Sequence, residues 1–255
     1  GTFVGALLRS GDTGFGEAEA PLIAAWIDRV RDAVGPDCVI YVRIDGAADC
    51  TEILATIEGK SAFFVTKASM TAELCGAIAT TTKWTTVDRD ADGRPLQQVA
   101  EIRIARQAWT ARGQAFRVIA VRTRDRLPGK QIALWSDLDY TVQVFITNEW
   151  TEAPLGVAQR YDLRAGIEPM LGEAKSAWAI GKVPSQCFAA NHAALLLKLL
   201  AFNLMRRYIR MTRPELTTWR APWIRRALIN VPGRIARSGR GRTLYVPRRS
   251  SLARM

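Results

Sequence analysis

The sequence predicts an α/β (α+β) fold: a layered core of alternating helices and strands, split by an antiparallel β-rich insertion and followed by a basic tail. Three observations predict it. Helical and strand periodicities take turns over residues 1–82, apolar and polar residues alternate over residues 83–150, and helical periodicity returns over residues 151–210. Residues 211–255 form the arginine-rich tail. With 255 residues, 48% of them hydrophobic, the chain can bury a substantial core.

The first segment alternates between strands and helices. The pattern predicts a strand and turn at residues 2–11, a helix at 17–35 stopped by Gly35, a strand at 39–44, a helix at 51–58 and a strand at 62–66. Asp45 directly follows the strand VIYVRI. Open α/β sheets bind their ligands at the carboxyl ends of strands, so Asp45 is a candidate site residue.

The second segment has the period of two that is typical of half-buried strands. We expect strands within residues 99–109, 114–124 and 140–148, separated by turn-prone sequence at 111–114, 125–130 and 137–139. These residues separate Asp45 from the later acid Glu168 by far more than the roughly 30 residues of one crossover. An antiparallel insertion between the two acids explains the distance.

Helical periodicity then extends from residue 154 to about 210, with a break at 179–184. Its most apolar run, residues 193–204, contains Lys198 and is shorter than the roughly 20 residues that span a bilayer. We therefore expect a buried helix rather than a membrane segment, with His192 as a hydrogen-bonded core histidine.

The net charge of +12 belongs to the end of the chain. Residues 206–255 contain fourteen arginines and one acid, Glu215, whereas the rest of the chain is nearly neutral. We expect a short helix at 217–230 and a hairpin around Gly239 and Gly241, whose arginines form a strip facing one way: Arg234, Arg237, Arg240 and Arg242. Arginines interleaved with aromatic residues favour a nucleic acid partner over a merely solvated face or a membrane.

Cysteine usage excludes a zinc site. The cysteines at positions 38, 50, 75 and 187 have no Cys-x2-Cys spacing, and His192 is the one histidine. Reduced thiols and the absence of an export signal at the start of the sequence favour the cytoplasm.

Four polar residues at fixed intervals carry the strongest functional signal: Tyr161, Arg164, Glu168 and Lys175. On a continuous helix all four would project from one stripe roughly 60° wide. Pro169 places Glu168 at a kink or at a helix start. One carboxylate among cations suits a metal-binding acid beside a phosphate backbone.

The spacing Tyr-x2-Arg-x3-Glu-x6-Lys resembles the YREK signature of the DDE transposases of bacterial insertion sequences. The stretches 161–175 and 188–210 look like the same parts of that family, and VIYVRIDGAAD at 39–49 is similar to the strand that ends in the family's second catalytic aspartate. The resemblance implies an RNase H-like core split by the β insertion. It also implies metal-dependent DNA cleavage and strand transfer at insertion-sequence ends.

The resemblance assigns a role to each site residue. Asp45 and Glu168 would be catalytic acids that bind Mg²⁺, for which Mn²⁺ can substitute, while Tyr161, Arg164 and Lys175 would contact phosphates at the element's terminus. The expected partners are the element ends and a target duplex, with a homodimer in the synaptic complex. We expect a nucleoid-associated protein of the cytoplasm.

The sequence also departs from the family pattern. Gly46, Ala47 and Ala48 follow Asp45, where the family more often has a small residue followed by Gly-Phe, and Asp49 could replace Asp45. No residue before Asp45 takes the place of the family's first aspartate, because Asp12 falls in a turn. We therefore expect a C-terminal portion of a longer transposase that is inactive alone. The alternatives are a DNA-binding remnant without catalysis and a nuclease of the same fold.

Overall fold

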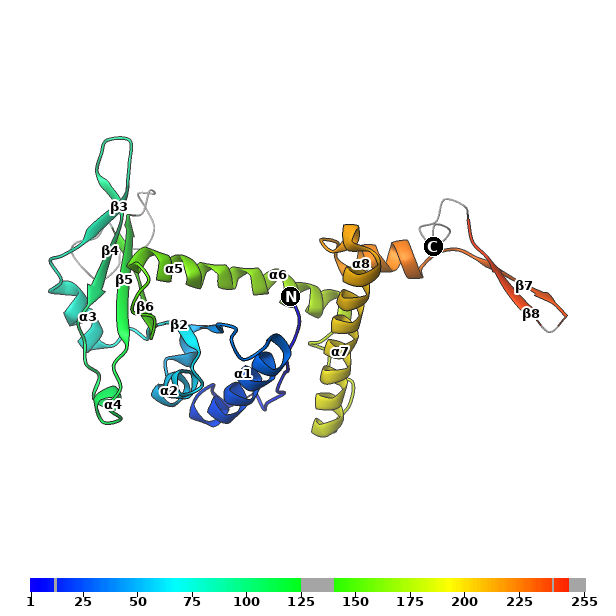
Figure 1. Cartoon of the computed structure of the whole chain (residues 1–255), viewed down its shortest axis with the longest axis horizontal. Helices are drawn as coiled ribbons and strands as arrows, with labels where there is room; N and C mark the ends of the chain where they lie inside the picture. Colours follow the sequence, from blue (N-terminus) through cyan, green and yellow to red (C-terminus); the bar gives the residue numbers. More distant parts are fainter. Residues whose placement is uncertain (12, 125–139, 240, 248–255) are drawn as a thin grey trace. The chain divides into compact units, whose positions relative to one another are not determined.

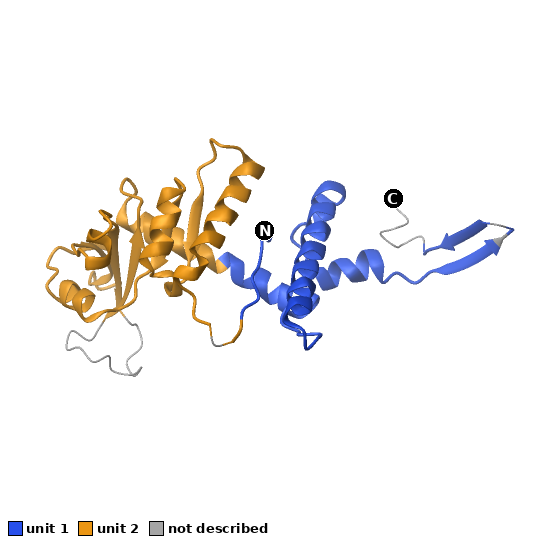
Figure 2. Cartoon of the chain, turned by 90° about the horizontal axis from the view of Figure 1, so that it is seen from below, with its two compact units in different colours: residues 1–9, 166–255 blue, residues 10–165 orange. Residues whose placement is uncertain are grey.

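The structure is a computed structural model that describes residues 1–11, 13–124, 140–239 and 241–247. The chain divides into two compact units (Figure 2): Ser10–Ala165, and Gly1–Arg9 together with Gly166–Met255. The turns predicted at 125–130 and 137–139, Asp12 and Arg240 lie outside the described residues.

The unit Ser10–Ala165 is built on one mixed sheet (Figure 1). Among the described residues its strands lie in the order β1-β2-β6-β5-β4-β3, where β1 and β2 are parallel and all other neighbours antiparallel. The strands are β1 (Tyr41–Ile44), β2 (Phe63–Lys67), β3 (Thr85–Arg89), β4 (Pro95–Ile102), β5 (Arg117–Arg124) and β6 (Tyr140–Thr147). The antiparallel strands between residues 83 and 150 therefore extend the edge of β2 and do not form a sheet of their own.

Helices cover both faces of this sheet. Phe64 and Ile146 pack in one buried cluster with residues of α1 (Ala20–Val34), α2 (Thr51–Gly59), α3 (Ala72–Ala79) and α4 (Gln107–Thr110). Their strand neighbours Val65 and Phe145 pack in a second cluster with α5 (Pro154–Asp162). Because successive side chains of a strand point to opposite faces, α5 covers the face opposite to α1 and α2.

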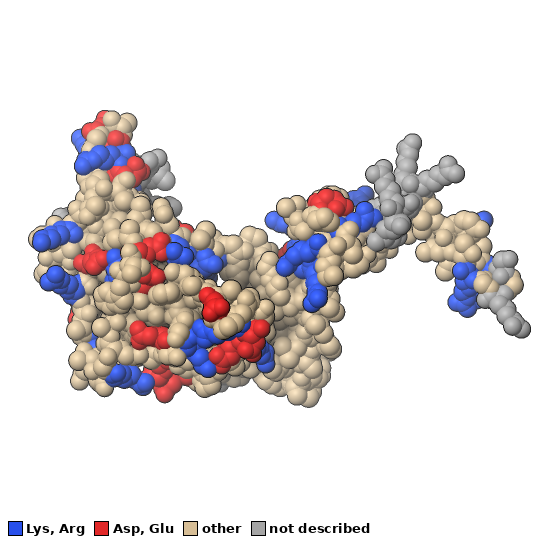
Figure 3. Space-filling view, in the orientation of Figure 1, with Lys and Arg blue, Asp and Glu red and all other residues tan. Residues whose placement is uncertain are grey.

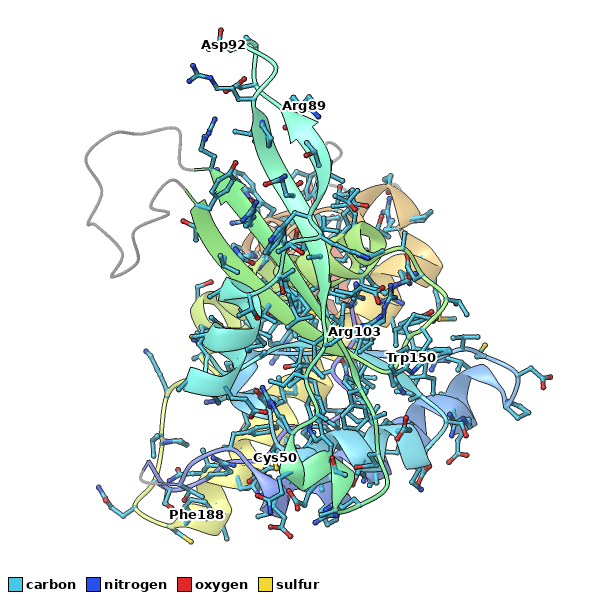
Figure 4. All side chains as sticks on the ribbon, turned by 90° about the vertical axis from the view of Figure 1, so that its left-hand side faces the viewer. Cys50, Arg89, Asp92, Arg103, Trp150 and Phe188 are labelled. Carbon is cyan, nitrogen blue, oxygen red and sulfur yellow. The ribbon has the colours of Figure 1, made fainter. Side chains whose placement is uncertain are left out.

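Local sequence explains most of the element boundaries in this unit. Helix α1 ends at Gly35, whose φ of 104° is readily adopted by glycine alone, as the sequence predicted. At the tip of the β3–β4 hairpin, which carries Arg89 and Asp92 (Figure 4), the carboxylate of Asp90 accepts hydrogen bonds from the backbone N–H groups of Asp92 and Arg94. Such local bonds stabilise a tight turn between two strands.

Two predicted strands are wrong in part or in full. The strand predicted at 99–109 ends at Ile102, and Gln107–Thr110 forms a helical turn that buries Trp109 against Phe116. The strand predicted at 2–11 is absent from the described residues there. The backbone of Phe3 instead exchanges two hydrogen bonds with the side-chain amide of Asn203, which replaces a strand partner.

The second unit consists of helices and a terminal hairpin. Its elements are α6 (Ile167–Trp178), α7 (Phe188–Thr212), α8 (Ala221–Ile224), β7 (Arg234–Ser238) and β8 (Gly241–Tyr245). The π segment Arg225–Ile229 follows α8, and a short 3₁₀ segment lies at Pro214–Leu216. Three further 3₁₀ segments lie at or before the start of α6, at Glu17–Glu19, Gly46–Ala48 and Leu163–Gly166. The helical region, its break and the terminal hairpin confirm the sequence prediction.

A buried carboxylate joins the three helices of this unit. Glu173 of α6 forms an ion pair with Arg206 of α7 at 2.6 Å and accepts a hydrogen bond from the backbone N–H of Ala221 at the start of α8. His192 lies 3.3 Å from the carbonyl oxygen of Ala6, in keeping with the expected hydrogen-bonded histidine.

Helix α7 is buried on one side only, so the expectation of a buried helix is wrong for much of its surface. Phe202 and Ile209 are buried, whereas five large apolar side chains on another side are exposed: Leu197, Leu200, Leu204, Tyr208 and Met211. By length and hydropathy, α7 is the one helix in the described part of the chain that could cross a membrane. A single such helix is weak evidence of membrane insertion.

We expect Glu173→Gln to lower the free energy of unfolding by about 3 kcal/mol, because Arg206 would keep a largely buried charge without its carboxylate. Denaturation in urea followed by circular dichroism measures the change. Glu215→Gln is the matched control: Glu215 lies 3.6 Å from Arg213 and is 58% exposed, so its loss should cost less than about 1 kcal/mol. Equal losses of unfolding free energy in the two variants would contradict the role of Glu173 in joining the three helices.

Candidate functional site

Asp45 lies at the carboxyl end of β1, on the face of the sheet that α5 covers. Val42 and Ile44 pack toward α1 and α2, so the alternate positions 41, 43 and 45 project to the other side. Its Oδ1 accepts hydrogen bonds from the backbone N–H of Gly46 at 2.8 Å and from the hydroxyl of Tyr161 at 3.4 Å. Within the described residues its Oδ2 accepts none, and the residue is exposed. This oxygen is open to an incoming ligand.

Tyr161, near the end of α5, is a buried residue with a polar tip. Its ring packs on Phe145 of β6 with 5.1 Å between the ring centroids, and 4% of the residue is exposed. Burial raises the pKa of Tyr161, the nearby cation Arg164 opposes this, and the carboxylate of Asp45 adds to it. The phenol therefore stays protonated at neutral pH and donates its hydrogen bond to Asp45.

Two cations flank the Tyr161 ring. The Nζ atom of Lys67 lies 5.5 Å from the ring centroid and the guanidinium carbon of Arg164 lies 5.7 Å from it. Sequence reasoning missed Lys67, although a signal was present. Lys67 ends β2, the parallel neighbour of β1, and parallel strands bring their carboxyl ends to the same edge of a sheet.

Asp49, the alternative acid, has a structural role. Its side chain is 2% exposed and forms an ion pair with Arg106 at 2.5 Å, while its other oxygen accepts a hydrogen bond from the backbone N–H of Ser69. Arg106 in turn lies over the ring of Trp109, at 4.9 Å from its centroid. Both oxygens of Asp49 are thus occupied, which favours Asp45 as the acid available to a ligand.

Glu168 and Lys175 lie on α6, in the other unit, and both are exposed. Glu168 is the second residue of this helix and Pro169 the third. Of the two predicted alternatives, a kink and a helix start, the structure therefore shows a helix start, where proline is tolerated in the first turn. Seven residues apart, Glu168 and Lys175 share one side of α6, opposite the buried Glu173. Because Asp45 and Glu168 belong to different units, their joint binding of a metal stays a prediction.

The idea of one continuous stripe is wrong. Tyr161 belongs to α5, Glu168 belongs to α6, and the 3₁₀ segment Leu163–Gly166 with Arg164 separates the two helices. A 3₁₀ segment has 3.0 residues per turn, so the angles of a single α-helix do not apply through it. The structure brings Tyr161, Arg164 and Asp45 together within one unit.

The terminal hairpin also differs from its prediction. Arg237 of β7 lies opposite Arg242 of β8, and Arg234 lies opposite Tyr245. Arg234 and Arg237 are an odd number of positions apart, so they project to opposite faces. The described arginines therefore do not form one strip.

Asp45 provides one of the oxygen ligands that a hard cation such as Mg²⁺ requires. Carboxylate oxygens are the ligands that Mg²⁺ prefers, and Asp45 offers one that is open. Across the described ranges of the chain, no three His, Cys, Asp or Glu side chains come together in a group that could hold a metal ion. Within its unit, Asp45 is thus a single open carboxylate and not a member of such a group.

The hydroxyl and the ring of Tyr161 contribute separately to the free energy of unfolding. We expect Tyr161→Phe to lower the free energy of unfolding by about 1 kcal/mol through the lost hydrogen bond. Tyr161→Ala should lower it by about 3–5 kcal/mol, because α5 would lose its buried ring against the sheet. Urea denaturation of both variants measures the difference. If Tyr161→Ala is as stable as Tyr161→Phe, the packing described for α5 is wrong.

The comparisons with known proteins agree with the resemblance in the sequence. Residues 1–255 match a family model described as Transposase DDE domain group 1. No curated protein matches the chain. Because the family model covers the chain from its first residue to its last, the chain belongs to the family of transposase DDE domains, group 1.

Proposed function

We propose that the chain carries two acids of the metal-dependent cleavage and strand-transfer site of a bacterial insertion-sequence transposase of the YREK subgroup. Membership in a DDE transposase family implies DNA transposition, with DNA as a partner and a divalent metal ion as cofactor. The narrower claims, which concern the subgroup, the residues and the metal, rest on the local geometry and on the motif spacing.

One observation carries the proposal. The exposed carboxylate of Asp45 has an open oxygen at the carboxyl end of a strand, and its other oxygen accepts a hydrogen bond from Tyr161, whose ring has Lys67 and Arg164 beside it. Asp49, by contrast, has both carboxylate oxygens bound within the fold and a buried side chain. The unbound carboxylate oxygen can bind a metal ion, and the neighbouring cations can bind a phosphodiester.

The proposed cofactor is Mg²⁺, for which Mn²⁺ can substitute, held by Asp45 and Glu168 with further oxygen ligands. When bound, such an ion would activate a water or a 3′-hydroxyl as the nucleophile and would stabilise the leaving oxygen. Asp45 is oriented for this role by the hydrogen bonds from Gly46 and Tyr161. Tyr161 stays protonated, so it orients the acid and does not accept a proton.

The cations position the DNA. Arg164 can hold a phosphate through two parallel N–H groups, while Lys67 and Lys175 act as point charges. Lys67 and Arg164 flank the ring of Tyr161 beside Asp45, and Lys175 lies on the same side of α6 as Glu168. We propose that these groups bind phosphates near the scissile bond at the element's end.

An inactive DNA-binding remnant is the second candidate. The resemblance implies three acids, and it matches two residues of this sequence to them, Asp45 and Glu168. We therefore propose that the 255-residue chain alone neither nicks nor joins DNA, while the transposase that contains all three acids does both. A nuclease of the same fold would cut without joining, so an acceptor duplex in the assay separates it from a transposase.

We further propose that residues 1–82 and 151–210 form an RNase H-like core, that residues 83–150 are a β insertion and that residues 211–255 are a DNA-binding tail. We also propose a homodimer in the synaptic complex and a nucleoid-associated protein in the cytoplasm.

We expect Asp45→Asn to weaken Mn²⁺ binding by this chain at least about tenfold, because the open carboxylate oxygen loses its charge. Electron paramagnetic resonance of free Mn²⁺ measures the affinity. In the transposase with all three acids, the same change should abolish Mg²⁺-dependent cleavage of an element end and leave duplex binding nearly intact.

Asp49→Asn is the matched control, with the same change four residues away. It should leave Mn²⁺ affinity unchanged and lower the free energy of unfolding, because Arg106 loses its buried partner. If Asp49→Asn weakened Mn²⁺ binding and Asp45→Asn did not, the two acids would have the opposite roles.

A further inference from the structure

The terminal hairpin is a two-stranded ribbon with both faces open to solvent. Gly239 directly follows β7 and has a φ of 59°, which suits a tight hairpin. Ile235 is 66% exposed and Leu244 61% exposed. A two-stranded hairpin of this kind is marginally stable by itself. Its side chains therefore do not form a hydrophobic core and are available for binding.

The two faces differ in chemistry. Directly opposite residues share a face, so Ile235, Arg237, Arg242 and Leu244 form one face of the ribbon, which we call the arginine-pair face. Arg234 lies on the other face, with its guanidinium carbon 5.5 Å from the ring centroid of Tyr245. Arg234 therefore has a partner within the hairpin.

The arginine-pair face opposes the stability of the hairpin. Arg237 lies directly across from Arg242, and like charges in that position are destabilising. The chain has no acidic residue after Glu215 that could neutralise them locally. In Figure 3 the visible surface of this hairpin carries basic atoms and no acidic ones. Such a face is stabilised when a polyanion binds to it.

The width of the ribbon matches the major groove of a DNA duplex and exceeds the minor groove. Two strands lie about 4.8 Å apart, and with their side chains the ribbon is roughly 10 Å across. The major groove of B-DNA is about 12 Å wide and admits a two-stranded ribbon, whereas the minor groove is about 6 Å wide. The side chains also fit, because arginine binds the major-groove edge of guanine and apolar groups contact the thymine methyl.

We propose that the β7–β8 hairpin enters the major groove of duplex DNA with its arginine-pair face toward the base edges. Arg237 and Arg242 then bind guanine edges, and Ile235 and Leu244 contact thymine methyl groups. This inference rests on the proposed function, since it takes the transposase's DNA as the ligand, and it gives the hairpin a role in recognising sequence.

The test uses three mixed-sequence duplexes in fluorescence anisotropy with the full chain. One contains guanine, the second contains 7-deazaguanine, which lacks the major-groove N7 acceptor, and the third contains inosine, which lacks the minor-groove amino group. The wild-type chain should bind the 7-deazaguanine duplex at least about fivefold more weakly than the guanine duplex. Inosine should change its affinity little.

The variants Arg237→Gln, Arg242→Gln and Arg234→Gln each remove one positive charge. The first two should lose much of the sensitivity to 7-deazaguanine, whereas Arg234→Gln should keep it, because Arg234 lies on the other face. Arg237→Lys keeps the charge but lacks the planar fork, so it should also lose sensitivity while keeping most of its affinity for the guanine duplex. Circular dichroism checks that each variant is folded.

Two outcomes would overturn the inference. Equal effects of all three glutamine variants, with no sensitivity to 7-deazaguanine, would mean that the arginines contact phosphates from either face. Sensitivity to inosine would place the hairpin in the minor groove. In both cases the metal site at Asp45 would stand, because Mn²⁺ binding is measured separately. A wild-type chain that bound no duplex at all would contradict the proposed DNA partner as well.

Discussion

The packing of α5 against the sheet is the interaction on which the candidate site depends. Val157 and Tyr161 bury their side chains against Val65 and Phe145, on the face opposite to α1 and α2. Polar contacts fix the same helix: Arg160 forms an ion pair with Glu152 and lies 4.1 Å from the ring centroid of Tyr41 on β1. Because both kinds of contact hold α5 beside β1, the hydroxyl of Tyr161 reaches Asp45. The cations around the ring follow from that placement.

Four acids among the described residues differ in how far they are buried. Asp49 and Glu173 are buried and have both carboxylate oxygens bound, one beside the sheet and the other between helices. Asp45 and Glu168 are exposed, at a strand end and in the first turn of a helix. A buried carboxylate requires such partners, whereas a metal-binding acid needs an accessible oxygen. By this contrast Asp49 and Glu173 have structural roles, and Asp45 and Glu168 stay candidates for metal binding.

Much of the fold follows from local sequence, because periodicity and stop signals are local properties. The strands on either side of α2, the end of α1 at Gly35 and the helix start at Glu168 were predicted for that reason. The role of Asp49 was not, because its partner Arg106 is 57 positions away and only the tertiary fold joins them. The exposed side of α7 could not be predicted either, since an apolar run does not reveal which of its sides is covered.

Two errors were avoidable from the sequence. Arg234 and Arg237 are separated by an odd number of positions, which already excludes a shared face on one strand. Lys67 follows the strand predicted at 62–66, and the predicted helix at 51–58 links that strand to the one before Asp45. Two strands linked by a helix are usually parallel, which brings Asp45 and Lys67 to the same edge of the sheet. Both cases show that register and strand direction carry functional information that charge counts alone do not.

The most direct test of the account is to map the metal by iron-mediated cleavage of the chain. Fe²⁺ bound in place of Mg²⁺ reduces added hydrogen peroxide to a hydroxide ion and a hydroxyl radical, and ascorbate converts the Fe³⁺ back to Fe²⁺. The radicals cut the backbone close to the ion. The account predicts cuts beside Asp45 and beside Lys67, and their loss in the Asp45→Asn variant but not in Asp49→Asn. Cuts that persist in Asp45→Asn, or that centre on Asp49 and Arg106, would contradict the assignment of the site.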